Sequence, residues 1–200
     1  QRFGRAGLSV EEAVQLGMRI AEGLGFAHAR GVIHRDIKPS NIFLPNQKLE
    51  DAKILDFGIA RFRNVRSEIT RTGVMIGTPG YMSPEQARGD RHIDPRCDVF
   101  SLGCVIYKCL TGQNAFRGTD PLAVMAKILV EPPPRPSAAG VIVPDELEAL
   151  IVRMLSKDPA GRPADGNEVL AELAKVLKAL GTTETAPPSR KRAPLFEAEQ

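Results

Sequence analysis

The stretch that decides the fold runs from His34 to Asn41 and reads His-Arg-Asp-Ile-Lys-Pro-Ser-Asn. It precedes two short apolar runs, Asn41–Leu44 and Ala52–Leu55, which are separated by a polar turn. These runs suit a small hairpin of about four residues per strand. The tripeptide Asp56-Phe57-Gly58 follows the second run directly. The two polar loops therefore flank one hairpin, and we expect them to meet at its edge.

A helical pattern leads into this stretch. Ser9 and Glu12 form a capping box, and apolar residues recur at helical spacing after them, so residues 9–29 are expected to form an amphipathic helix. Gly23 and Gly25 nearly spell a phosphate-binding loop, but no strand precedes them. We therefore expect these glycines to allow close helix packing.

The second half of the chain also reads as helical. Residues 96–111 are apolar on nearly every side, which indicates a buried central helix that ends at Gly112. Amphipathic helices are expected over residues 121–129, 145–155 and 165–180. Residues 59–76 show no sustained periodicity, which is typical of a functional or disordered loop.

Composition is ordinary for one soluble globular unit, with 42% hydrophobic and 26% charged residues. The formal net charge of +3 is too small to predict a nucleic-acid partner, and no window is apolar enough to cross a bilayer. Cys97, Cys104 and Cys109 lack CxxC spacing, so they are expected to be reduced core thiols of a cytoplasmic protein. Because the first residue is Gln1, we expect the chain to begin inside a larger gene product.

Taken together and in order, the two loops resemble the catalytic and magnesium loops of protein kinases. The resemblance covers residues 1–180. It implies an α+β fold, the mainly helical large lobe of a kinase with a small β-hairpin. It also implies a serine/threonine protein kinase, which transfers the γ-phosphate of Mg-ATP to Ser or Thr hydroxyls of protein substrates. ATP and Mg²⁺ would be the cofactors.

The same resemblance assigns roles within the site. Asp36 would accept the proton of the substrate hydroxyl, and Lys38 would place a positive charge on the transferred phosphate. Asn41 and Asp56 would hold magnesium, because oxygen ligands suit that ion. Ser40 would lie at the nucleotide, and Thr78 would belong to the catalytic group. His34 is expected to hold the loop in place by packing and hydrogen bonding.

Three further residues carry structural expectations. Residues 77–85, Gly-Thr-Pro-Gly-Tyr-Met-Ser-Pro-Glu, resemble the end of a kinase activation segment, with Ser83 where alanine is usual. Glu85 would pair with Arg162 and anchor this segment. Asp98 resembles the buried aspartate that binds the catalytic-loop backbone. The combination of Lys38 and Thr78 is the serine/threonine pattern, and the wording of the segment is most similar to bacterial members.

Regulation is expected through phosphorylation of the activation segment. Arg35, next to Asp36, would sense the phosphate, since arginine pairs well with that group. Thr70 and Thr72 lie at the spacing that bacterial relatives autophosphorylate, and Ser67 is a weaker candidate.

The sequence contains neither a Gly-x-Gly-x-x-Gly loop nor a Val-Ala-Ile-Lys strand. We therefore expect the N-terminal lobe to be absent and the isolated chain to be inactive, because several preorganised groups would be missing at once. Residues 181–200 are expected to form a disordered Pro-rich basic linker. Two alternatives stay open: a truncated kinase remnant that acts as a protein-binding module, and a kinase of small molecules.

Overall fold

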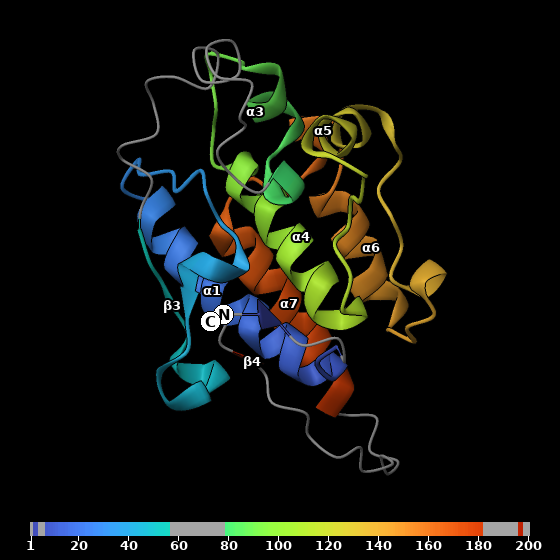
Figure 1. Cartoon of the computed structure of the whole chain (residues 1–200). Helices are drawn as coiled ribbons and strands as arrows, with labels where there is room; N and C mark the ends of the chain where they lie inside the picture. The colour runs from blue at the N-terminus through green and yellow to red at the C-terminus, as the bar shows by residue number, and fades with distance from the viewer. Residues whose placement is uncertain (1, 4–6, 57–78, 182–195, 198–200) are drawn as a thin grey trace.

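The computed structural model describes residues 2–3, 7–56, 79–181 and 196–197. In this part of the chain, helices pack around a central helix, and a small hairpin lies at one edge (Figure 1). The expected mainly helical lobe with a small hairpin is confirmed. The principal helices are α1 (Val10–His28), α3 (Pro84–Arg88), α4 (Arg96–Thr111), α5 (Pro121–Val130), α6 (Asp145–Met154) and α7 (Gly166–Gly181).

Helix α4 is the core of the molecule, as its all-round apolar pattern predicts. Nearly all of its side chains are buried, and Phe100 stacks on Phe116 with ring centroids 6.0 Å apart. Gly112 ends the helix in the left-handed conformation, with φ of 69°. Because α4 contacts α1 and α6 on different sides, residues carried on it can reach several parts of the fold.

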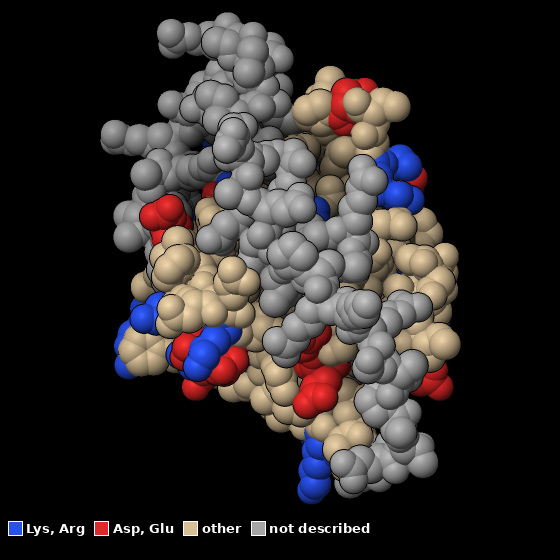
Figure 2. Space-filling model, turned by 60° about the horizontal axis from the view of Figure 1, so that its bottom comes forward, with Lys and Arg blue, Asp and Glu red and all other residues tan. Residues whose placement is uncertain are grey.

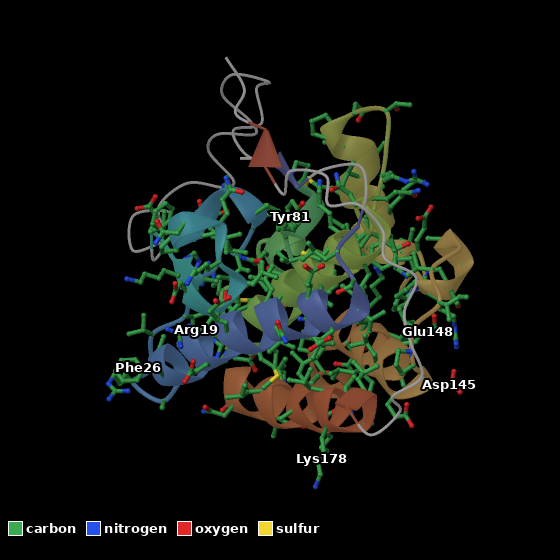
Figure 3. All side chains as sticks on the ribbon, turned by 90° about the horizontal axis from the view of Figure 1, so that it is seen from below. Arg19, Phe26, Tyr81, Asp145, Glu148 and Lys178 are labelled. Carbon is green, nitrogen blue, oxygen red and sulfur yellow. The ribbon has the colours of Figure 1, made fainter. Side chains whose placement is uncertain are left out.

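Helices α1 and α7 lie side by side (Figure 3). The Ser9 capping box opens α1, with Ser9 Oγ accepting from Glu12 N and Glu12 Oε2 accepting from Ser9 N. A Cβ built on Gly25 would lie 3.0 Å from the backbone nitrogen of Asn167, and one built on Gly166 would lie 2.4 Å from Gly25 N, so glycines allow this close approach. The expectation that a glycine of this helix permits close packing is confirmed at Gly25.

The hairpin is shorter than expected. Its strands, β2 (Ile42–Phe43) and β3 (Lys53–Ile54), pair antiparallel with Ile42 opposite Ile54. The expectation of four residues per strand is wrong because short 3₁₀ turns occupy the flanks: η1 (Pro39–Asn41), η2 (Pro45–Gln47) and η3 (Leu49–Asp51). In the η1 turn Asn41 N donates to Lys38 O, so Asn41 belongs to the loop that begins at His34 and not to the strand.

The remaining elements are small. The 3₁₀ turn η5 (Pro79–Tyr81) leads to α3, η6 (Ser137–Ala139) precedes α6, and η7 (Pro159–Gly161) follows it. Within the expected linker, β4 (Phe196–Glu197) pairs antiparallel with β1 (Arg2–Phe3). On the face shown in Figure 2, acidic and basic side chains of the described residues are interspersed. None of the described helices is long and apolar enough to traverse a bilayer.

Candidate catalytic site

The loop from His34 to Asn41 is anchored on Asp98, in the first turn of α4. Asp98 is fully buried, and its carboxylate accepts hydrogen bonds from His34 N (2.7 Å) and Arg35 N (2.6 Å). A buried carboxylate without partners would be strongly destabilising. These two backbone donors therefore compensate the burial of the Asp98 carboxylate, and they hold the first residues of the loop in place.

His28, at the end of α1, adds a third donor to Asp98. Its Nδ1 accepts from Gly166 N (3.2 Å), so its Nε2 carries the proton and donates to Asp98 (2.9 Å). One imidazole ring thus joins α1, α4 and α7 beneath the loop. A lone histidine at a helix end has no distinguishing pattern, so the sequence alone does not reveal this role.

His34 ties the loop to the segment that leads to Asp56. Its Nδ1 accepts from Asp36 N (3.2 Å), and its Nε2 donates to the carbonyl of Leu55 (2.9 Å). The amide of Leu55 in turn donates to the carbonyl of Asn41 (2.8 Å). The chain therefore enters Asp56 at the same end of the hairpin as the His34–Asn41 loop.

Asp36, Lys38 and Asn41 form one cluster. Lys38 Nζ lies 3.0 Å from Asp36 Oδ2, and Asn41 Nδ2 donates both to that oxygen (3.1 Å) and to the Asp36 carbonyl (2.7 Å). Because the amide nitrogen of Asn41 is turned toward Asp36, its oxygen faces elsewhere. Asp36 and Lys38 are partly exposed, so a substrate could reach both groups.

Two residues of the site have the left-handed backbone conformation, with φ of 66° at Arg35 and 52° at Asp56. Non-glycine residues adopt it rarely, and such residues gather at functional sites. Asp56 is exposed and directly follows Leu55, which is bonded to both His34 and Asn41. Ser40 is exposed at the same loop.

Arg35 connects the catalytic loop to α3. Its carbonyl accepts from Gln86 Nε2 (2.9 Å), and Gln86 also completes a capping box with Ser83. Burial lowers the pKa of the Arg35 guanidinium, and the negative charge of Asp98 opposes that shift. The Ser-x-x-Gln pattern at Ser83 is the signal from which this short helix could have been found.

Glu85 and Arg162 are brought together, both buried. Arg162 Nη1 donates to Glu85 Oε1 (2.7 Å), and Nη2 donates to Oε2 (2.9 Å). Further bonds from the guanidinium reach the carbonyls of Ser156, Arg96 and Lys157. The segment after residue 79 is therefore fastened to the lobe through a buried ion pair.

The chemistry of the donor set fits a hard cation. A carboxylate at Asp56 and an amide oxygen at Asn41 are ligands that magnesium accepts, with phosphate and water oxygens completing its shell. No group of three or more His, Cys, Asp or Glu residues able to hold a metal occurs in the described part of the chain. Two protein oxygen ligands leave room in the shell of such an ion for phosphate and water oxygens. Thr70, Thr72 and Thr78 lie outside the described residues, as do Phe57 and Gly58.

Comparison with known proteins identifies the family of this chain. The protein kinase domain family matches residues 4–175. The chain therefore belongs to the protein kinase domain family.

The chain is similar to bacterial serine/threonine-protein kinases. It is 40% identical over 170 residues to the serine/threonine-protein kinase PknB of Mycolicibacterium smegmatis, a match that covers 84% of this chain and 27% of the relative. It is 38% identical over 187 residues to the serine/threonine-protein kinase pkn3 of Myxococcus xanthus, covering 90% and 34%. The chain thus spans between a quarter and about a third of these relatives.

A solved structure shows the same fold. The crystal structure of Rad53 1-466 in complex with AMP-PNP aligns with a TM-score of 0.66 and 23% identity, covering 83% of this chain and 40% of that chain.

Proposed function

We propose that the protein containing this chain transfers the γ-phosphate of Mg-ATP to Ser or Thr hydroxyls of protein substrates. The observation that carries the proposal is the hydrogen-bonded cluster of Asp36, Lys38 and Asn41, held at the hairpin edge by the buried Asp98. Phosphoryl transfer has a loose transition state, so catalysis consists mostly of positioning and charge neutralisation. A rigid loop that presents a carboxylate, an ammonium and an amide supplies both.

Each group has a distinct task. Asp36 accepts the proton of the attacking hydroxyl and orients its oxygen, and Lys38 neutralises charge on the phosphate. Asn41 and Asp56 hold Mg²⁺, which when bound neutralises the charge of the phosphate oxygens. Ser40 lies at the nucleotide, and Thr78 completes the catalytic group.

Phe43 is a candidate for the nucleotide base. It follows the buried Ile42 in β2 and has 42% of its surface exposed. An aromatic ring just after the His34–Asn41 loop offers an apolar face to a purine, which ATP carries. A phenylalanine within a strand resembles a core residue, so the sequence alone does not single out Phe43.

Activity would be regulated at Thr70 and Thr72. A phosphate there would place up to two negative charges near the site, and the partly buried cation of Arg35 would pair with them. Phosphopeptide mapping of the active protein tests this part, and finding both threonines unmodified would contradict it.

We also propose that residues 1–180 form the large lobe of a kinase domain and that residues 181–200 form a linker. The protein would act in the cytoplasm, where ATP is available. Three free, buried thiols, at Cys97, Cys104 and Cys109, suit a reducing compartment.

The test is transfer of labelled phosphate from γ-³²P-ATP to a basic protein substrate by the full-length protein. Asp36→Asn should lower the transfer rate by about a hundredfold or more, because the group that receives the proton is lost. Asp145→Asn is the matched control, since Asp145 is an exposed carboxylate at the start of α6. Equal rates for all three proteins would contradict the assignment of Asp36. Substrate binding without any transfer by the wild type would favour a binding module instead.

A further inference from the structure

A hollow of about 310 Å³ lies outside the Asp36 cluster, between η5 and the connection from α4 to α5. Its walls are mostly apolar or small. The residues that line it are Pro79, Gly80, Asn114, Phe116, Arg117, Gly118 and Val124. Arg117 is exposed and carries the only formal charge among these residues.

The side chain of Asn114 has a defined orientation in this hollow. Its Oδ1 accepts from Lys108 Nζ (2.8 Å) and from the hydroxyl of Tyr81 (3.3 Å). An ammonium can only donate, so the oxygen must face Lys108 and the NH₂ group must face away from it. Burial raises the pKa of Tyr81, which keeps its hydroxyl protonated as a donor. Asn114 therefore presents a hydrogen-bond donor, not an acceptor.

Two basic side chains lie at the hollow. Arg117 stands at its wall, and the half-buried ammonium of Lys108 lies directly behind Asn114. The acidic group nearest in sequence is Asp120, whose carboxylate already accepts from Ala123 N and from the hydroxyl of Thr119. An apolar wall with a guanidinium, an amide donor and a second cation behind it is complementary to a carboxylate on a short aliphatic stem.

One segment, residues 79–86, both lines the hollow and contacts the loop that carries Asp36. Gly80 lines the hollow, and Gln86, six positions on, donates to the carbonyl of Arg35 beside Asp36. An extended chain rises at most about 3.5 Å per residue, so the two sites are within reach of one short peptide. This separation is short enough for one polypeptide to contact both Asp36 and the hollow.

We propose that this hollow is a docking subsite for an Asp or Glu side chain of the protein substrate, with Arg117 and the amide of Asn114 as its specificity-determining groups. The proposal rests on the proposed function, because it names the class of substrate that this site prefers. Proteins with an acidic residue near the phosphorylated Ser or Thr would be selected.

The experiment measures binding separately from transfer. An array of short Thr-containing peptides carries Glu, Gln, Lys or phosphoserine at each position in turn, and it is probed with tagged full-length protein. At one position of the peptide, the wild type should bind peptides with Glu about tenfold more tightly than the same peptides with Gln. One charge-assisted hydrogen bond contributes about this much. Arg117→Gln should abolish this preference, and Arg117→Glu should shift it to Lys. Arg19→Gln, an exposed arginine on α1, is the matched control (Figure 3).

A second variant guards against loss of the fold. Asn114→Asp keeps an acceptor for Lys108 and Tyr81 but removes the donor and adds a negative charge. It should therefore abolish the selection of Glu peptides, while its free energy of unfolding stays close to that of the wild type. Retention that is identical in the wild type and in the Arg117 and Asn114 variants, or restricted to phosphoserine peptides, would overturn the proposal. Phosphate transfer to the retained peptides is measured separately. Glu-selective retention without transfer would contradict the proposed kinase function but would still support the subsite.

Discussion

The guanidinium of Arg162 and the carboxylate of Glu85 face each other through two parallel hydrogen bonds, although 77 positions separate them in sequence. Both groups are buried, and the arginine side chain has no exposed surface. Arg162 also lies with its guanidinium carbon 5.0 Å from the centre of the Phe100 ring, on the central helix. The ion pair thus fastens the segment that supports Arg35 to the core of the lobe.

Removing one partner of this pair should be strongly destabilising. Arg162→Met leaves the buried carboxylate of Glu85 without its counter-charge, which costs about 3–5 kcal/mol of the free energy of unfolding. Urea denaturation measures it. The double variant Arg162→Met with Glu85→Leu should be less destabilised than the single one, because no buried charge remains. Arg135→Met, which breaks an exposed pair with Glu148, should change stability by less than about 1 kcal/mol and serves as control.

Asp98→Asn should loosen the catalytic loop. One oxygen becomes an NH₂ group, which must face a donor: either His28 Nε2 or the amide of His34 or Arg35. The free energy of unfolding should fall by about 3 kcal/mol, because a charge-assisted hydrogen bond is replaced by two donors that face each other. Hydrogen exchange at the amides of His34 and Arg35 should accelerate. Asp94→Asn, an exposed position just before α4, should leave that exchange unchanged. Unchanged exchange in Asp98→Asn would refute the anchoring role.

The contact between α1 and α7 should not tolerate a methyl group. A Cβ on Gly166 would lie 2.4 Å from Gly25 N and 2.5 Å from Ala21 O, and backbone atoms cannot move aside cheaply. Gly166→Ala should therefore lower the melting temperature, with a loss of about 1–3 kcal/mol or more. Gly181→Ala, at the end of the same helix with nothing within 4 Å, should be neutral or slightly stabilising. Equal melting temperatures for the two variants would contradict this packing.

Lys157 should make stability depend on pH in the alkaline range. Its ammonium lies 4.0 Å from the centre of the Phe116 ring, and burial lowers its pKa to about 8 from 10.5. Between these values the unfolded chain holds the proton that the folded protein has released, so this group makes the free energy of unfolding rise with pH. The buried cysteines oppose that trend, since burial raises the pKa of Cys104 and Cys109 to about 12.

The measurement is therefore the difference between the wild type and Lys157→Met. The stability of the wild type relative to the variant should rise as the pH increases from about 8 toward 10.5. A difference that stays constant over this range would show that the lysine keeps its charge, held by the Phe116 ring.

Much of the fold can be predicted from sequence patterns that lie within single helices. The capping box at Ser9 and the all-round apolar run of α4 predict their helices, because both signals lie within one element. Helix α3 was missed, since five residues are too few for a period to be visible. The hairpin was overestimated because Asn41 bonds to Lys38 and Asp36 instead of continuing a strand.

The candidate site divides in the same way. Asp36, Lys38 and Asn41 could be named because they follow one another in a recognisable order. The bond from Gly166 to His28 spans 138 positions and has no local signature. The orientation of Asn114 likewise depends on Lys108 and Tyr81, which only the folded chain brings to it. Sequence patterns locate such groups, but the partner that orients each of them comes from elsewhere in the chain.

The bond between His28 and the first amide of α7 has a consequence for biosynthesis. During translation, the loop that carries Asp36 leaves the ribosome long before residue 166 does. Until that late segment emerges, the Nδ1 of His28 lacks the donor that orients the ring, although the amides of His34 and Arg35 can already bind Asp98. A nascent chain would therefore complete the hydrogen bonds around His28 only after residue 166 has emerged, near the end of the lobe's synthesis.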